Sequence, residues 1–249
     1  MRIATTSCSH YVSESLRRAE LYRWFAGLIA DRLDPVLLRA YREGPGRDIL
    51  DNLAKIPALE DGARRIEAAL DTEKSDRDLV EALACDFRSL FEKGAANPRA
   101  SHWLGLESDD ASGPDTRSDH QPDILSRMKA LLRHSGLGLR PSFPSAPDHL
   151  AVLLVVMAQT AEASLAEWRK ANPSAASSDR PVCEVEELVQ GCRDQKAFID
   201  HNLLSWLPAF RDACTRHDPD GFYAGVSALL VAYLEQDRVF LSDCITQAD

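Results

Sequence analysis

The sequence lacks the patterns that mark several common classes of enzyme. It has no glycine-rich phosphate loop, because Gly44-Pro45-Gly46 has neither the preceding strand nor the lysine of such a loop. It contains no G-x-S-x-G nucleophile elbow either. These absences argue against a P-loop nucleotidase and against an α/β-hydrolase.

Long apolar runs are also missing. The run from Leu150 to Ala158 is nine residues long, whereas a membrane-spanning helix needs about 20. The first residues, Met1 to His10, are polar and show no hydrophobic signal region. We therefore expect a cytoplasmic protein that does not span a membrane.

Positive charge is scarce as well. The chain carries 29 lysines and arginines against 39 aspartates and glutamates, which gives a formal net charge of −10 at pH 7. A protein that binds nucleic-acid phosphates needs a basic face, and no basic recognition helix stands out. The charge therefore predicts no nucleic-acid partner and favours a basic or apolar one.

The cysteines are not arranged as a metal-binding motif. No pair has C-x-x-C spacing, and Cys183 and Cys192 are too far apart for a zinc knuckle. In a reducing compartment all the cysteines are expected to be free thiols. Their positions are 8, 85, 183, 192, 214 and 244.

What the sequence does contain is helical periodicity. Apolar residues recur at three- and four-residue spacing, and no segment alternates as a strand does. The predicted helices cover residues of about 13–33, 35–44, 49–53, 66–70, 79–94, 124–132, 150–170, 198–210 and 219–234. Pro208 is expected to kink or split the helix at 198–210. Asp218 is expected to cap the last helix, with Pro219 in its first turn. The fold class is all-α, a single globular bundle of about ten helices.

The most distinctive stretch precedes the apolar run. Prolines at 141, 144 and 147 hold the approach extended, and Ser145-x-x-Asp148 has the form of a capping box. Pro147 would then stand in the first turn of the central helix. We interpret 1–249 as one domain, with an N-terminal half (1–140), a hinge (141–147) and a C-terminal half (148–249).

Asp148 and His149 form the only acid–imidazole pair in a structurally marked position. The residues alone leave three roles open: capping or hinge function, peptide or ligand binding, and catalysis. A catalytic role would make the protein a metal-dependent all-α hydrolase that uses Asp148, His149 and another histidine such as His201. Such a site needs further ligands on neighbouring helices.

Four segments, in order along most of the chain, resemble the TorD/DmsD/NarJ family of cytoplasmic chaperones for molybdenum-cofactor oxidoreductases. The first is the opening helix with Arg18, Tyr22 and Leu28. The remaining three are the run from Asp86 to Phe91 with the loop from Pro98 to Leu104, Pro147-Asp148-His149-Leu150 with its apolar helix, and the stretch from Phe198 through Trp206 and Phe210 to Tyr223.

This resemblance implies a chaperone rather than an enzyme. Its partners would be a molybdopterin-containing oxidoreductase of the trimethylamine N-oxide/dimethyl sulfoxide reductase family in its apo form and that client's twin-arginine leader peptide. The molybdopterin cofactor belongs to the client, and the resemblance implies no cofactor of the chaperone's own except guanine-nucleotide binding. It also implies a monomer or a domain-swapped dimer. The leader-binding residues would be Phe87, Leu90, Phe91, Pro98, Ser101, Trp103, Pro147, Asp148 and His149.

Two departures from the family pattern affect the preference for a leader. Arg99 stands where an aromatic residue is frequent, and a basic side chain there fits poorly with an arginine-bearing ligand. Ser145 and Leu153 or Leu154 replace acidic residues. The expected mechanism is capture of the leader in an apolar cleft formed by Leu90, Phe91 and Trp103, with carboxylates such as Asp148 nearby for the leader's arginine pair.

Overall fold

The computed structural model describes residues 5–105, 146–171, 185–218 and 220–246, and these ranges are predominantly helical. Within them no strand occurs, which confirms the all-α prediction. The helices are α1 (Thr5–Ala30), α2 (Pro35–Glu43), α3 (Pro45–Leu53), α4 (Glu60–Leu70), α5 (Asp76–Phe87), α6 (Ala100–Trp103), α8 (Leu150–Ala171), α9 (Val185–Phe198), α10 (Leu207–His217) and α11 (Phe222–Thr246). Two π-helical turns, η1 (Arg88–Glu92) and η3 (Ile199–Leu203), follow α5 and α9.

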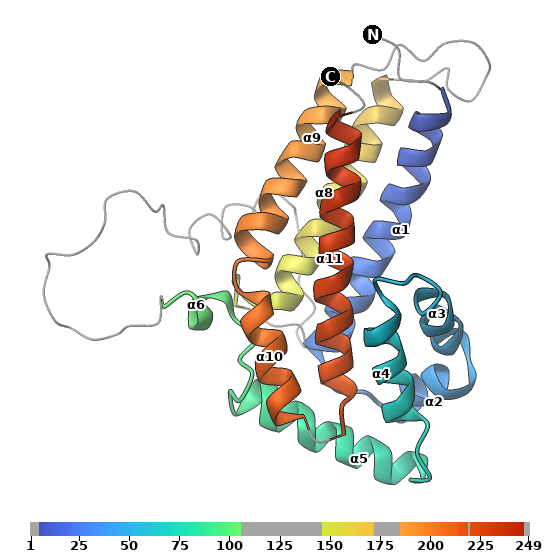
Figure 1. Cartoon of the computed structure of the whole chain (residues 1–249), viewed down its shortest axis with the longest axis vertical. Coiled ribbons are helices and arrows are strands. Elements are labelled where there is room, and N and C mark those ends of the chain that lie inside the picture. The colour runs from blue at the N-terminus through green and yellow to red at the C-terminus, as the bar shows by residue number, and fades with distance from the viewer. Residues whose placement is uncertain (1–4, 106–145, 172–184, 219, 247–249) are drawn as a thin grey trace, which may run out of the picture.

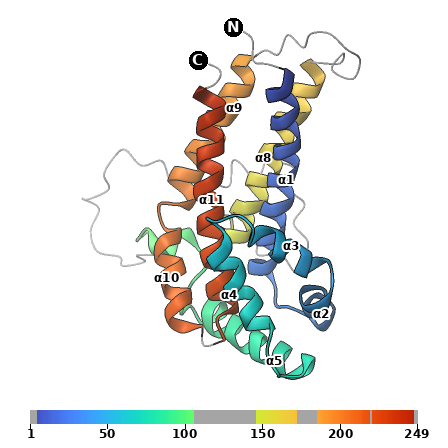
Figure 2. The ribbon, with the colours of Figure 1, turned by 45° about the vertical axis from the view of Figure 1, so that its right-hand side comes forward.

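Four long helices run side by side along the length of the molecule, and the shorter ones gather at one end (Figures 1 and 2). Along the bundle α8 packs on α1, while α11 packs on α9. At the lower end α11 also contacts α4 and α10. The C-terminal helix therefore belongs to both parts of the structure.

The apolar run at the start of α8 is the centre of the bundle. Every residue from Leu150 to Ala158 is buried except Val155, which is partly buried. Full burial of one such side chain stabilises a fold by about 1.5–3 kcal/mol. The start of α8 is therefore covered by other elements on nearly all sides.

The cap predicted for the start of this helix is wrong. Helix α8 begins at Leu150, so Pro147 and Asp148 lie in the preceding turn and not in the first helical turn. The Asp148 side chain does not reach back along its own helix, because it bonds to another segment, Ser101. The capping box is therefore not formed as predicted; Ser145, its other half, lies outside the described residues.

A buried polar cluster joins three of the long helices. Arg18 of α1 forms an ion pair with Asp237 of α11 and donates from Nη2 to Oε1 of Gln195 of α9 at 2.8 Å. Tyr22 also donates to Asp237, at 2.6 Å. Burial alone would lower the pKa of Arg18, but the charge of Asp237 raises it above its ordinary value. The cluster is internal, and within the described residues only Nη1 of Arg18 among its guanidinium nitrogens is left without a hydrogen-bond partner.

The C-terminal segment divides as the prolines indicate. Pro208 lies in the first turn of α10, and the chain before it forms η3, so the predicted split is confirmed. The start of α11 was predicted too early. The helix begins at Phe222, and Asp218 still accepts from the Ala224 amide at 2.7 Å. Gly221, with a φ of 82°, makes the turn between them in the left-handed region that favours glycine.

Two predictions fall on residues that the structure does not describe: the helix at 124–132 and the hinge up to residue 145. Cys85, Cys192, Cys214 and Cys244 are free thiols, as expected. Among the described residues, no helix combines the length and the apolar character that crossing a membrane requires.

Candidate functional site

The Asp-His turn and the proline-led loop are joined by their backbones. Arg99 and His149 form an isolated antiparallel bridge. The Ala100 amide donates to the Asp148 carbonyl at 3.1 Å, and the Leu150 amide donates to the Pro98 carbonyl at 2.8 Å. Two segments far apart in sequence are thereby fixed together at the start of α8.

The Asp148 carboxylate completes this junction. Its Oδ2 accepts from the Ser101 amide at 3.2 Å and from the Ser101 hydroxyl at 2.5 Å, and its Oδ1 accepts from Arg99 Nε at 3.3 Å. Burial alone would raise the pKa of Asp148, but the hydrogen bonds from Ser101 and the charge of Arg99 lower it below its ordinary value. Asp148 is therefore an ionised, fully buried residue that caps the short helix α6 from a distant part of the chain.

His149 stays neutral at physiological pH. Burial lowers its pKa to about 4; the neighbouring Asp148 acts in the opposite direction, and Arg99 lowers it further. Its Nδ1 accepts from the Ala151 amide at 3.2 Å. The half-buried ring is thus an uncharged imidazole, and no described residue forms a hydrogen bond with its Nε2.

Trp103 lies at the edge of an aromatic cluster. Its Nε1 donates to the Asn97 carbonyl at 2.7 Å, which fixes the indole, and its ring contacts Phe210 edge-on at 6.4 Å between centroids. Phe210 stacks on Phe91 at 5.9 Å, and Phe91 contacts Phe87 at 5.0 Å. The half-buried indole of Trp103 thus contacts Phe210 of α10, which in turn packs against the phenylalanines of η1 and α5.

The π-turn η1 helps to place these rings. The Lys93 amide donates to the Arg88 carbonyl at 2.8 Å, a five-residue hydrogen bond that widens the helix by one residue. Leu90 and Phe91 lie in this turn and are both buried. Gly94, with a φ of 83°, ends the segment, as the sequence predicted.

The structure brings most of the predicted site residues together but exposes only a few. Half-buried are Trp103, Pro147 and His149. Buried are Phe87, Leu90, Phe91, Pro98, Ser101 and Asp148. The sequence reasoning missed the ion pair of Arg99 with Asp148 and the role of Phe210 as the support of Trp103. No local signal marks either contact, because the partners are far apart in the chain.

The catalytic alternative gains no support. The described residues hold no group of three histidine, cysteine, aspartate or glutamate side chains placed to bind a metal ion. His201 is exposed on η3, and Asp148 is already held by Ser101 and Arg99.

The fold and the site together define a structural class of protein. It is an all-α bundle in which an Asp-His turn is hydrogen-bonded to a proline-led loop, next to a cluster of aromatic side chains. Comparison with known families gives a match to the one described as nitrate reductase delta subunit, over residues 55–212. The match covers more than half of the chain, and the chain belongs to this family, the TorD/NarJ family.

Curated relatives extend the likeness to nearly the whole sequence. The chain is 29% identical to the Chaperone protein TorD of Aliivibrio fischeri, over 91% of this chain and 95% of the relative. It is 30% identical to that of Aliivibrio salmonicida, also over 91% of this chain and 95% of the relative. For Photobacterium profundum the identity is 29%, over 93% of this chain and 97% of the relative.

Proposed function

We propose that this protein is a cytoplasmic chaperone, not an enzyme, for a molybdopterin-containing oxidoreductase of the trimethylamine N-oxide/dimethyl sulfoxide reductase family. It binds the client's twin-arginine leader and apo form, protects them, and aids cofactor insertion before export. The family membership and the relatives named as chaperones support this role. Molybdopterin belongs to the client; binding of a guanine nucleotide and a domain-swapped dimer stay predictions of the family resemblance.

The observation that carries the leader-binding part is the environment of Trp103. The indole is half-buried, its N–H is used internally, and its ring rests on Phe210. Such a ring is ordered before any ligand arrives, so little side-chain entropy is lost when an apolar segment covers it. Tryptophan is also among the residues that most often dominate binding energy.

His149 extends this surface without opposing a basic ligand. Because its pKa is about 4, the imidazole carries no charge at pH 7 and does not repel an arginine pair. Its exposed part contributes area and a hydrogen-bonding edge next to Pro147. The apolar segment of a leader fits this surface better than its arginines do.

The leader's arginines have no open carboxylate at the Asp-His turn. Asp148 is fully buried, and its oxygens are occupied by Ser101 and Arg99. An arginine of the ligand would have to displace the Arg99 side chain, which is 40% exposed and within reach of solvent. We therefore assign Asp148 to holding the loop in position rather than to contacting the leader.

Calorimetric titration with a synthetic twin-arginine leader tests the proposal. Wild type should bind saturably, and Trp103→Ala should weaken binding by about tenfold or more, the loss typical of a central aromatic contact. His149→Ala should weaken binding less. His217→Ala, an exposed histidine at the end of α10, is the matched control and should leave affinity unchanged.

Circular dichroism must show that each variant is folded. Two results would contradict the proposal: equal affinities for wild type and both site variants, or no binding of the folded wild type to either the leader or a purified apo-oxidoreductase.

A further inference from the structure

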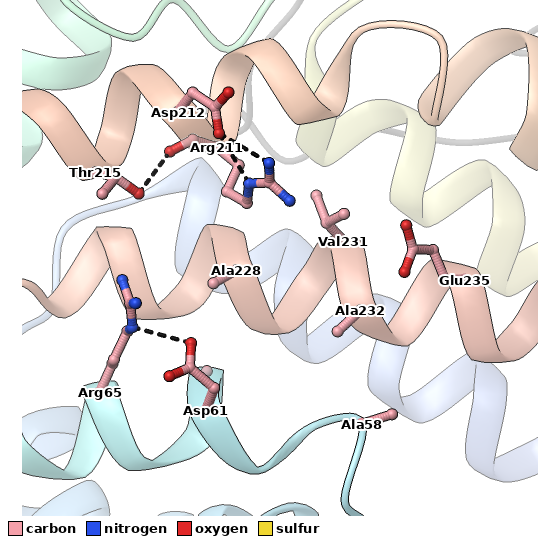
Figure 3. A pocket seen from close by; sticks show the side chains of 11 residues that line it. Ala58, Asp61, Arg65, Arg211, Asp212, Thr215, Ala228, Val231, Ala232 and Glu235 are labelled. Atoms are coloured by element: carbon pink, nitrogen blue, oxygen red, sulfur yellow. Dashed lines mark hydrogen bonds and ion pairs between the residues drawn. The ribbon is translucent and has the colours of Figure 1, made fainter.

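A groove of about 390 Å³ lies between α4, α10 and α11 (Figure 3), and no residue of the Asp-His turn lines it. The face of α11 between the two other helices forms its floor, with Ala228, Val231 and Ala232. Helices α4 and α10 form the walls. The volume falls in the range of sites that hold small ligands or a few side chains of a peptide.

The sequence fixes this shape through small residues. At Gly62 the backbone of α4 approaches α11 so closely that an added Cβ would lie 2.6 Å from the backbone of Leu229. The alanines of the floor are only partly buried, so the groove is open along α11. An aliphatic stem or a short stretch of apolar side chains can lie against this floor without displacing any helix.

The charges in the groove are neutralised with one exception. Arg65 pairs with Asp61 of the same helix at 3.0 Å, and Arg211 pairs with the adjacent Asp212 at 2.8 Å, so each wall is neutral. Glu235, at the end of the floor, is exposed and forms no hydrogen bond or ion pair with the other residues that line the groove (Figure 3). The lining therefore has one unpaired negative charge beside an apolar floor.

We propose that this groove is a second peptide-binding site, which takes an apolar segment carrying one basic side chain and pairs that side chain with Glu235. The small floor accommodates the apolar part, and the unpaired carboxylate selects the cation. An acidic segment would meet Glu235, Asp61 and Asp212 together. The identity of the segment as part of a client's leader rests on the proposed function; the site itself does not.

The groove also supplies an exposed carboxylate, which the Asp-His turn lacks. Asp148 is buried and already bonded, whereas Glu235 is exposed. Phe210, which contacts Trp103, directly precedes Arg211 of the groove wall, so their side chains leave α10 about 100° apart. The Trp103 surface and the groove are thus joined through α10.

The test uses a short alanine–leucine peptide with one central arginine, and matched peptides with glutamine or glutamate in its place. Alanine-methyl NMR signals of the full-length protein report binding at Ala228 and Ala232. The arginine peptide should shift these signals saturably. Glu235→Gln should weaken its binding by about fivefold, the worth of one partly exposed ion pair, and should not change the binding of the glutamine peptide.

Glu186→Gln removes the same charge from an exposed position on α9 and should have no effect. The proposal is overturned if the arginine peptide leaves the two alanine signals unmoved, if Glu235→Gln does not weaken it, or if the glutamate peptide binds more tightly. The last result would make Arg65 and Arg211 an anion site.

The twin-arginine leader, titrated in the same way, separates this proposal from the proposed function. A leader that binds at Trp103 without moving the groove signals would support the function and overturn the groove as a site for that leader. An arginine peptide that binds the groove while the leader binds nowhere would support the site and contradict the function.

Discussion

At the scale of single residues, two buried aspartates behave in opposite ways. Asp148 has its charge satisfied by Ser101 and Arg99, and its pKa lies below the ordinary value. Asp86, at the end of α5, has an Oδ2 without a hydrogen-bond partner among the described residues, and burial together with Asp218 raises its pKa to about 6. The difference lies in the partners that each carboxylate meets, because both side chains are buried.

For Asp148 we expect Asp148→Asn to lower the free energy of unfolding at pH 7 by about 1–3 kcal/mol, because a charged, hydrogen-bonded acceptor is lost. A depressed folded pKa stabilises the fold above the unfolded pKa, and this contribution is lost as the pH falls through the folded value. Urea unfolding at several pH values should therefore show the largest deficit near neutrality and a shrinking one below about pH 4. A deficit that grows on acidification would contradict this assignment.

For Asp86 the contribution to stability changes with pH in the opposite direction. A folded pKa of about 6 means that the folded state holds its proton more tightly than the unfolded chain, so stability falls as the pH rises from about 4 to 6. Asp86→Asn should raise the free energy of unfolding at pH 8 by about 1–2 kcal/mol and have little effect at pH 4. Glu81→Gln, exposed on the same helix, is the control and should change neither value. Destabilisation at pH 8 would show that the carboxylate has a favourable role.

At the scale of the elements, the sequence predicted those features that depend on residues close together in the chain. Most helices within the described residues were found from apolar spacing, and Pro208 and Gly94 marked real boundaries, but α9 and the short α6 were not predicted. The π-turns were not predicted, since their widened hydrogen bonds leave no signature in apolar spacing. The capping box before α8 was predicted wrongly because the Asp148 side chain bonds to Ser101, 47 residues away, and no short-range capping rule can anticipate that.

The contact between α4 and α11 gives a matched pair of glycine substitutions. Gly62→Ala should destabilise the protein by about 1–3 kcal/mol, because the new Cβ would meet the α11 backbone at 2.6 Å. Gly27→Ala, exposed in α1 with nothing within 4 Å of the new Cβ, should stabilise by about 0.5–1 kcal/mol through helix propensity. Thermal unfolding compares the two; equal effects of the same sign would refute this account of the α4–α11 contact.

At the scale of the whole molecule, the cluster of Arg18, Asp237, Tyr22 and Gln195 ties the long helices α1, α9 and α11 together. The sequence identified Arg18 and Tyr22 only through the family resemblance. The structure gives them an internal, structural role, and neither contributes to the surface around Trp103.

Replacing one partner of this ion pair should lower the free energy of unfolding far more than replacing both. Arg18→Met or Asp237→Leu alone should cost about 3–5 kcal/mol, because a buried charge is left unpaired. The double variant should recover part of that loss, which a double-mutant cycle in urea measures. Strictly additive losses would show that the two side chains do not depend on each other.

The bridge between Arg99 and His149 also closes a loop. Its ends are held by the bonds of Pro98, Ala100 and Ser101 to the turn that opens α8, so the chain between them is tethered at a common base. The entropy of such a closure depends only logarithmically on length: halving the intervening segment would favour the closed junction by about 0.6 kcal/mol. The junction therefore depends far more on the bonds at its two ends than on the number of residues between them, so Trp103 and His149 are expected to keep their places when that number changes.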